Sequence, residues 1–479
     1  MKSVLTVSLT ALLAGQAFAY DVVLLGGRVM DPETGLDAVR NVAIENGVIA
    51  AVSGEPLSGT VRIQASGLVV APGFIDLHAH GQDVRSNRFQ AADGVTTALE
   101  CEIGTLPVAG FLESRAGNAP IHYGTTAGHL AARVKLLTGA DMIDLTSASA
   151  SSATGLESAT KMALSAEQVD RLGVLIEEGV RAGGLGIGIG ITYVPGAEHG
   201  EIFDVFRTAA RLGVPVFTHM RQERYMGGDL LAPLQEVLAN AAASGASLHV
   251  VHLNSSLAEK ARTAMEMIRG ARANGVDVTT ESYPYTAGST RLESALFDDY
   301  EGDYSQLQWT ATGERLDEET FHEYRRQGGW VIIHGRNEET NAWIVAQPDI
   351  MVASDGVPFV GQFSHPRSAG TFARVLGHYV RERGDLQLMT ALKKMTLDPA
   401  RRLEQVAPAL RRKARVQEGM DADLVLFDPR TILDRATYLK PAQTSAGVAH
   451  VLVSGEFVVR DGNLVEGVFP GRAIVSAID

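Results

Sequence analysis

This chain of 479 residues holds a single cysteine, has no long apolar run beyond its first residues, and carries fewer basic than acidic residues. With only Cys101, the chain has no internal disulfide, so its stability must come from a hydrophobic core or from bound metal. Because no later segment of about twenty apolar residues occurs, we expect no membrane-spanning helix in the mature chain. The 42 basic residues against 56 acidic ones leave a net charge of −14, which argues against nucleic acid or an anionic membrane as a partner.

The N-terminus has the features of an export signal. Lys2 supplies positive charge, Val4 to Ala14 form the apolar stretch, and Ala17-Phe18-Ala19 supplies the small residues of a cleavage site. The apolar stretch is too short to span a bilayer as an anchor. We therefore expect residues 1–19 to be removed and the mature chain to be exported, either to the periplasm or out of the cell.

Strand patterns concentrate at the two ends of the mature chain. Short apolar segments there are separated by turn residues, and Glu45-Asn46-Gly47 and Val453-Ser454-Gly455 are typical of β-hairpin turns. The simplest assembly is one small β-sandwich domain to which both termini contribute, with residues 20–68 and 412–479.

The middle of the chain, residues 69–411, alternates strand-like and helix-like segments. One helix begins at a capping box, Ser165 to Gln168, and extends to about Ala182. Repeated β–α units of this length predict an α/β fold in which a parallel sheet closes into a (β/α)₈ barrel of the TIM type. The irregular, acidic segments 289–302 and 306–313 are expected to form a loop over the barrel mouth. The segments predicted as strands are 69–80, 95–102, 184–193, 214–219, 248–253, 276–282, 329–334 and 350–354.

The stretch Gly73-Phe-Ile-Asp-Leu-His-Ala-His80 is the strongest functional signal in the chain. Side chains alternate along a strand, so His78 and His80 point to the same side. Two imidazoles on one face at the end of a strand provide half of a divalent-metal site. Asp76 and two histidines in one apolar strand would be costly to bury without such a partner.

Further polar residues follow other predicted strands. His219 ends one strand, His252 ends the next, and Asp355 directly follows a third. In a barrel of this type the reacting groups lie at the C-terminal ends of the strands, so these residues and the first histidine pair predict one shared metal site. His249 points to the opposite face of its strand from His252 and is expected to lie outside the site.

A carboxylate or thiolate is needed to hold or bridge the metal, and the strand at 95–102 offers three candidates. Glu100 and Glu102 share one face of that strand, whereas Cys101 points away. Two acids in an apolar strand need a cation or a hydrogen-bond donor, which favours a glutamate ligand. The choice among the three stays open, with Glu102 nearer the end of the strand.

With these residues in place, the chain resembles the amidohydrolase superfamily and, within it, the D-aminoacylase (N-acyl-D-amino-acid deacylase) group. The resemblance implies a metal-dependent hydrolase that binds one or two Zn²⁺ ions. It also implies that Asp355 is the catalytic acid–base, and Asp355 is a further candidate metal ligand. The ligands that it implies are His78, His80, His219 and His252. The segments that carry it span almost the whole mature chain: Gly73 to His80, Gly94-Val-Thr-Thr97, Ile191-Thr-Tyr-Val-Pro-Gly196, Thr218-His-Met-Arg-Gln-Glu223, Ser282-Tyr-Pro-Tyr-Thr-Ala287, Ser354-Asp-Gly356, His365-Pro-Arg367 with Gly370-Thr-Phe372, and Met420-Asp-Ala-Asp-Leu-Val425.

One position departs from that group. Its members carry a ligating cysteine in an Asn-Cys-Gly segment after the Gly-Val-Thr-Thr motif, whereas this chain has Glu100-Cys-Glu-Ile-Gly104, with Cys101 two residues early. A replacement of the thiolate by glutamate fits this difference. Many amidohydrolases instead bridge two metals with a carboxylated lysine on the fourth strand, but this chain has no lysine between Lys161 and Lys260.

The expected reaction is deacylation of a small N-acyl amino acid, plausibly of the D series, by metal-activated water, with Asp355 carrying the proton. Such a substrate has a carboxylate, which a guanidinium binds through paired hydrogen bonds. Arg367 is the first candidate for this role and Arg221 the second. The tyrosines expected to line the pocket follow predicted strands: Tyr193, Tyr283 and Tyr285.

Two other functions fit the same pattern. A dipeptidase, or a cyclic-amide hydrolase of the hydantoinase or dihydroorotase type, would use a similar site on a dipeptide-like or cyclic substrate. A catalytically silent barrel that only binds a ligand is an alternative of another class, against which the presence of Asp355 argues. The sequence leaves a homo-oligomer, the side chain of the substrate and its stereochemistry open.

Overall fold

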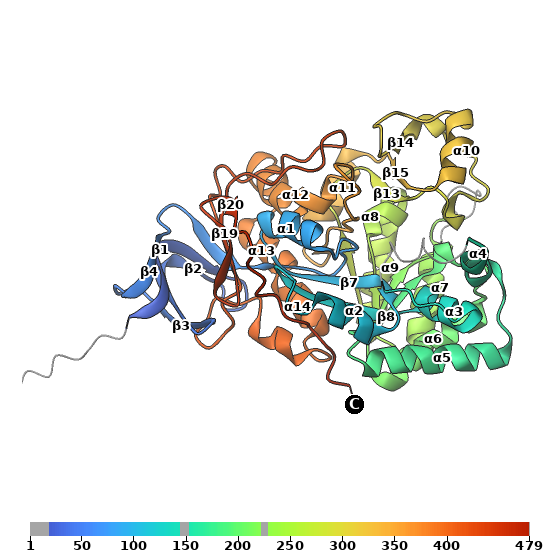
Figure 1. The fold of residues 1–479 in the computed structure, drawn as a ribbon, viewed down its shortest axis with the longest axis horizontal. Coiled ribbons are helices and arrows are strands. Elements are labelled where there is room, and N and C mark those ends of the chain that lie inside the picture. Colours follow the sequence, from blue (N-terminus) through green and yellow to red (C-terminus); the bar gives the residue numbers. More distant parts are fainter. Residues whose placement is uncertain (1–18, 144–152, 222–228, 479) are drawn as a thin grey trace, which may run out of the picture.

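The computed structural model describes residues 19–143, 153–221 and 229–478. Figure 1 shows a β-rich part at one end of the molecule, a barrel with its helices in the middle, and a small insertion beside the barrel at the other end. The predicted export signal lies almost entirely in residues 1–18, outside the described residues. Within the described residues, no helix is both long enough and apolar enough to cross a membrane.

Both ends of the chain build one nine-stranded sheet, in the order β20-β19-β18-β17-β5-β1-β2-β3 with β4 beside β1. The two predicted hairpin turns are confirmed, because Asn46 and Ser454 adopt left-handed φ angles of 51° and 50° ahead of a glycine. The sheet folds over an apolar core that includes Leu24, Ile44 and Leu426. Its strands are β1 Tyr20–Asp31, β2 Leu36–Glu45, β3 Val48–Ser53, β4 Gly59–Gln64, β5 Val69–Pro72, β17 Leu424–Phe427, β18 Val448–Val453, β19 Glu456–Arg460 and β20 Asn463–Leu464.

The middle of the chain forms the predicted barrel of parallel strands, in the order β16-β12-β11-β10-β9-β8-β7-β6. The His80 amide donates to the Gly356 carbonyl at 2.8 Å, which links the first and last strands at the end where the polar residues gather. The eight strands are β6 Phe74–Asp76, β7 Val95–Thr105, β8 His122–Gly128, β9 Ile187–Gly190, β10 Val216–His219, β11 Leu248–Val250, β12 Val278–Ser282 and β16 Met351–Val352.

Helices follow most of the barrel strands and cover the outside of the barrel (Figure 1). The capping box at Ser165 and Gln168 is present and opens α5 as expected. The barrel helices are α1 Val84–Ala92, α2 Val108–Arg115, α3 His129–Thr138, α4 Ala153–Lys161, α5 Ala166–Arg181, α6 His199–Leu212, α7 Ala232–Ser244, α8 Leu253–Ser256, α9 Ala261–Ala273, α11 Glu338–Ala346, α12 Arg367–Arg374, α13 Leu388–Met395 and α14 Leu397–Leu403.

The prediction of a barrel strand at 329–334 is wrong. β15 (Trp330–Ile333) instead pairs antiparallel with β13 (Gly288–Arg291) and β14 (Leu307–Trp309), and this small sheet forms the insertion together with α10 (Glu318–Gln327). The expected irregular loop is therefore partly ordered as a sheet. The eighth barrel position belongs to β8, which the sequence did not reveal because its residues are mostly small or polar rather than an apolar run.

The predicted strand at 69–80 divides at Gly73. β5 pairs with β1 and β17 in the terminal sheet, whereas β6 pairs with β7 in the barrel. A Cβ atom at Gly73 would come within 2.1 Å of the Thr96 side chain, so only glycine fits where the chain passes from one sheet to the other.

Candidate metal centre

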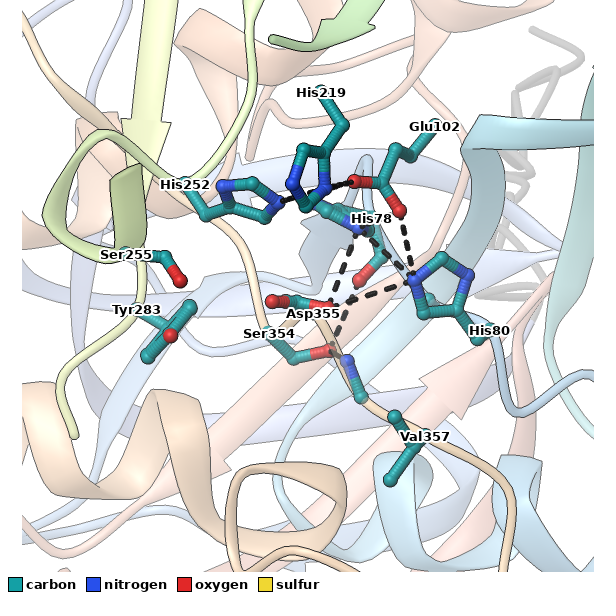
Figure 2. A network of polar contacts seen from close by, with 12 residues as sticks. His78, His80, Glu102, His219, His252, Ser255, Tyr283, Ser354, Asp355 and Val357 are labelled. Atoms are coloured by element: carbon teal, nitrogen blue, oxygen red, sulfur yellow. Dashed lines mark hydrogen bonds and ion pairs between the residues drawn. The ribbon is translucent and has the colours of Figure 1, made fainter. Parts of the chain in front are cut away.

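Six buried polar side chains meet at the C-terminal end of the barrel, as Figure 2 shows. Because parallel strands end at the same rim, residues far apart in sequence converge there. His219 is the last residue of β10, and Glu102 lies in β7. The others lie within four residues after the ends of β6, β11 and β16; the full set is His78, His80, Glu102, His219, His252 and Asp355.

Glu102 lies at the centre of this group and contacts all four histidines. Its Oε2 lies 3.2 Å from His78 Nε2 and 3.1 Å from His80 Nε2. Its Oε1 lies 2.7 Å from His219 Nδ1 and 3.0 Å from His252 Nε2. One carboxylate thus divides the histidines into two pairs, each facing one of its oxygens, which is the arrangement of a ligand that bridges two metal sites.

Two further glutamates hold the first histidine pair from behind. His78 donates through Nδ1 to Glu281 Oε1 at 2.6 Å, and His80 donates through Nδ1 to Glu100 Oε2 at 2.6 Å. A ring whose Nδ1 carries the proton presents the lone pair of Nε2 on its other side. Carboxylates that fix ring orientation in this way are typical of metal-ligating histidines.

The atoms that face one another in the centre are mostly acceptors. His78 Nε2 and His80 Nε2 lie 3.1 Å apart, with Asp355 Oδ1 at 3.4 and 3.5 Å from them. Lone pairs crowded in this way repel one another unless a cation lies among them. The group therefore fits a divalent metal with nitrogen and oxygen ligands, such as zinc.

The pKa values of His78 and Glu102 also indicate that the site binds a cation. Burial disfavours the charged form of His78, but the carboxylates of Asp355 and Glu102 outweigh burial and raise the pKa of His78 well above its ordinary value. Burial likewise opposes ionisation of Glu102, yet the imidazoles of His78 and His219 hold the pKa of Glu102 well below its ordinary value. The centre thus attracts positive charge, which a metal ion supplies in place of protons.

Two of the six residues have unusual backbone angles. His252 has φ = 31° and Asp355 has φ = 51°, both in the left-handed region that residues other than glycine seldom adopt. Such conformations cost roughly 1–3 kcal/mol each and persist where the surrounding structure determines them. In this chain they aim the two side chains at the centre.

Asp355 is bound to a buried arginine. Arg367 donates through Nη2 to Asp355 Oδ1 at 2.9 Å and to the Ser289 carbonyl at 3.1 Å. Burial would raise the pKa of Asp355, but the guanidinium of Arg367 and the ring of His78 outweigh it and lower that pKa. Asp355 is therefore ionised at neutral pH and able to accept a proton.

A cavity of about 460 Å³ opens beside these residues. Its inner wall includes His80, Glu102, His252 and Asp355. Its outer wall is formed by the insertion around β13 and β15, so this segment does cover the barrel mouth as expected. The size suits a small organic substrate.

The three candidate metal ligands on β7 lie in different surroundings. Glu102 faces all four histidines, whereas Glu100 contacts His80 only through Nδ1, on the far side of that ring. Cys101 is buried among apolar side chains, among them Leu99 and Phe217. His249 also lies outside the centre, donating or accepting only at Thr279 and Glu281.

The residues expected to bind substrate are only partly brought together. Tyr193 lines the cavity, with its ring 4.9 Å from that of His219. Of the five predicted residues, it is the only one in the described cavity wall. The other four do not line the cavity and are bound to other side chains: Arg367 to Asp355, Tyr283 to Arg336, Tyr285 to Asp434 and Arg221 to Glu236.

Two residues that the sequence analysis did not select belong to the site. Glu281 is a buried acid one residue before the end of β12, and the reasoning applied to Glu102 would have found it. Arg336 lines the cavity from the insertion. No local pattern marks Arg336, because its position depends on how the insertion packs against the barrel.

Comparison with known proteins agrees with this geometry. The model of the Amidohydrolase family matches residues 62–459. An N-acyl-D-glutamate deacylase of Alcaligenes xylosoxydans xylosoxydans is 30% identical over 475 residues, covering 91% of this chain and 93% of that protein. A D-aminoacylase of the same organism is 29% identical over 485 residues, covering 91% and 94%. The solved structure of an N-acyl-D-glutamate deacylase from Bordetella bronchiseptica, complexed with zinc and a phosphonate that mimics the tetrahedral intermediate, is 26% identical with a TM-score of 0.81, covering 95% of this chain and all of that one.

Proposed function

Because this chain belongs to the amidohydrolase family, we propose that it is a zinc-dependent deacylase that hydrolyses N-acyl-D-amino acids. The observation that carries the proposal is the Glu102 carboxylate between two histidine pairs, beside Asp355 and an open cavity. The similarity of this chain to deacylases of N-acyl-D-amino acids, which extends over nine-tenths of its length, supports N-acyl-D-amino acids as the substrate class.

The residues that would hold the metal are the four histidines and Glu102, with Asp355 within reach of the first pair. When bound, zinc supplies Lewis acidity, which lowers the pKa of a water molecule toward about 7 and polarises a carbonyl oxygen. Asp355 Oδ1 lies 3.4 Å from His78 Nε2, so Asp355 can act on water held at the same centre.

The charges around the histidines attract divalent cations, and the two histidine pairs on separate oxygens of Glu102 offer two places for them. Four carboxylates contact the site histidines or lie among them, and Arg367 is the cation paired with them. The net charge of this group is about −3 when the histidines are neutral, so one divalent ion would bring it to about −1 and two ions would bring it to about +1. The four carboxylates are those of Glu100, Glu102, Glu281 and Asp355.

In the proposed reaction, Asp355 carries one proton through the cycle. As a carboxylate it accepts a proton from the attacking water while a C–O bond forms at the amide carbon. It then donates this proton to the amide nitrogen as the C–N bond breaks, because the amine cannot leave as an anion. Arg367 keeps the carboxylate in place through its 2.9 Å contact with Oδ1. Tyr193, on the cavity wall, is positioned to contact the substrate.

A substrate panel tests this function. The purified, zinc-loaded protein is assayed for amine release from N-acetyl-D- and N-acetyl-L-leucine and from Leu-Leu dipeptides, and for ring opening of hydantoins to N-carbamoyl amino acids. We expect turnover of the N-acetyl-D compound, lost on chelation and restored by zinc. Turnover confined to dipeptides or hydantoins would assign the alternative enzyme function, and no turnover despite bound metal would favour a binding protein.

We also propose that the chain acts outside the cytoplasm. The basis is the N-terminal signal pattern of Lys2, the apolar stretch from Val4 to Ala14, and the site at Ala17 to Ala19. Cell fractionation and N-terminal sequencing test this proposal. We expect the exported protein to begin at Tyr20, and recovery of the full-length chain in the cytoplasm would contradict it.

A further inference from the structure

One wall of the cavity beside the metal centre consists of aliphatic side chains. Ile103, Leu130, Met142 and Leu156 line it and pack in one apolar cluster. We propose that this wall is the specificity pocket of the site and that it takes an aliphatic group of the substrate, carried by its side chain or by its acyl group. The inference rests on the proposed deacylase function, and it assigns to this chain substrates with an aliphatic rather than an acidic group at this place.

The aliphatic wall begins next to the metal centre. Ile103 directly follows Glu102 in β7, and Leu130 is the second residue of α3, which follows β8. Met142 is tied to the end of β7, because the backbones of Leu106 and Met142 exchange two hydrogen bonds of 2.8 Å. A substrate group attached to the scissile amide therefore meets this wall within the cavity that holds the metal ligands.

A buried arginine fixes the part of the wall that α4 supplies through Leu156. Arg133, in α3, donates through Nε to the Ala159 carbonyl at 2.6 Å and through Nη2 to the Met162 carbonyl. Its Nη1 lies 2.6 Å from the Glu201 carboxylate, which balances the buried charge. Figure 1 shows α4 between α3 and the insertion. Because the end of α4 is held in this way, the pocket is preformed, and little ordering is needed when an aliphatic group enters it.

Three of the cations that line the cavity are already paired with acids. Lys161 Nζ, on α4, lies 3.4 Å from Asp298 Oδ2, and Arg325 Nη2 lies 2.5 Å from Asp298 Oδ1. Arg291 is paired with Glu293. An acidic substrate group would have to compete with these carboxylates. Among aliphatic side chains it would lose its hydration without gaining a counter-charge.

The remaining guanidinium of the described cavity wall, that of Arg336, lies across the barrel. It donates to the Tyr283 hydroxyl at 2.7 Å and to Ser255 Oγ at 2.8 Å, and these two residues follow β12 and β11. In the order of the eight barrel strands, β11 is four strands from β7, and β12 is four strands from β8. A group on the aliphatic wall is therefore on the opposite side of the barrel from Arg336.

The test compares aliphatic with acidic substrates. One pair, N-acetyl-D-leucine and N-acetyl-D-glutamate, differs in the side chain, and a second, N-hexanoyl-D-alanine and N-succinyl-D-alanine, differs in the acyl group. The variants are Leu156→Lys, which places a cation on the wall, and Leu156→Ala, which only shortens the side chain. Val174→Lys, at a position of α5 that is 55% exposed, is the matched control. Steady-state kinetics give kcat/KM for each compound, and circular dichroism checks the fold.

We expect the zinc-loaded wild type to prefer the aliphatic member of at least one pair by about 10- to 100-fold in kcat/KM, the factor that burial of a leucine-sized group supplies. Leu156→Lys should lower this ratio at least about tenfold, because the cation pairs with the acid and apolar contact is lost. Leu156→Ala should lower kcat/KM for the aliphatic member alone, and Val174→Lys should leave the ratio unchanged.

The ratio reports on the pocket, because a damaged fold would lower both members of a pair alike. The pair that responds to Leu156→Lys identifies the substrate group that occupies the wall. A wild type without the aliphatic preference in either pair, or a preference that Leu156→Lys leaves unchanged, would overturn the proposal.

Binding separates this inference from the proposed reaction. Calorimetric titration of the four compounds into zinc-loaded Asp355→Asn, with and without Leu156→Lys, measures affinity without turnover. If the wild type hydrolyses none of them but the aliphatic members bind more tightly and Leu156→Lys removes this preference, the deacylase function fails while the pocket stands. If the wild type hydrolyses aliphatic and acidic members equally well, the pocket fails while the function stands. If no compound binds, both fail.

Discussion

His78 donates through Nδ1 to Glu281 Oε1 at 2.6 Å, which turns its Nε2 toward the centre of the site. Glu281 also contacts His249 Nε2 at 3.2 Å through its other oxygen, so it links a candidate ligand to the buried interior of the barrel. The protein itself thus orients the ring of His78. A partner of this kind also makes the imidazole a better ligand.

Replacing Glu281 by glutamine tests this contact. The amide keeps the shape but removes the charge, so we expect the affinity for zinc to fall about 10- to 100-fold, the usual effect of losing such a partner. Competition with a chromophoric chelator measures the affinity. Glu323→Gln, at an exposed position of α10, serves as the control and should bind zinc as the wild type does. Unchanged affinity in Glu281→Gln would show that the hydrogen bond does not support the metal.

Asp355→Asn tests the proton transfer. Asparagine cannot accept and return a proton, so we expect turnover to fall at least about 100-fold, the size of a general acid–base contribution. Because the four histidines and Glu102 remain, the protein should still bind metal. The measurements are kcat and zinc content, with Asp299→Asn at an exposed site as the control. Near-normal turnover would remove Asp355 from the mechanism.

Lys394 provides a prediction about pH and stability. Its ammonium is fully buried, where it donates to the carbonyls of Val345 and Gln347, and burial lowers the pKa of Lys394 to about 7. In the unfolded chain the pKa of Lys394 is about 10.4. Between about pH 7 and pH 10.4 the lysine is therefore protonated in the unfolded state and mostly neutral in the folded state. The stability of the folded state therefore increases as pH rises from 7 toward 10.4, and it is lost as pH falls toward 7.

Lys394→Met removes this dependence. We expect the free energy of unfolding of the wild type to rise relative to that of the variant by at most about 1.4 kcal/mol per pH unit between pH 7.5 and 9.5, so that its melting temperature rises relative to that of the variant. Differential scanning fluorimetry at several pH values measures it. Lys393→Met removes a neighbouring lysine that pairs with Asp398 and is the matched control. Parallel curves for the wild type and Lys394→Met would contradict the assignment.

The site could be predicted from the sequence where local periodicity decides the geometry. His78 and His80 share a face because side chains alternate along an extended chain, and their Nε2 atoms do lie 3.1 Å apart. His219 and His252 could be selected because strand ends meet at one rim of a barrel. These rules need only the order of elements along the chain.

Other features depend on contacts that no local pattern encodes. An apolar run such as Trp330–Ile333 indicates a strand but not the sheet that it joins, and this one joined the insertion. β8 was missed because a strand enclosed by neighbours can consist of small and polar residues. Arg336 lines the cavity and Arg367 contacts Asp355, and the sequence cannot distinguish two arginines in this respect.

The position of bound metal tests the central claim, that Glu102 bridges two metal sites. Crystals of the zinc-loaded protein can be measured with X-rays at the zinc absorption edge, which locates zinc independently of any assumed ligand. We expect two anomalous peaks, one between Glu102 Oε2 and the His78–His80 pair and one between Oε1 and the His219–His252 pair. A single zinc peak, or zinc peaks without contact to the Glu102 carboxylate, would contradict the account.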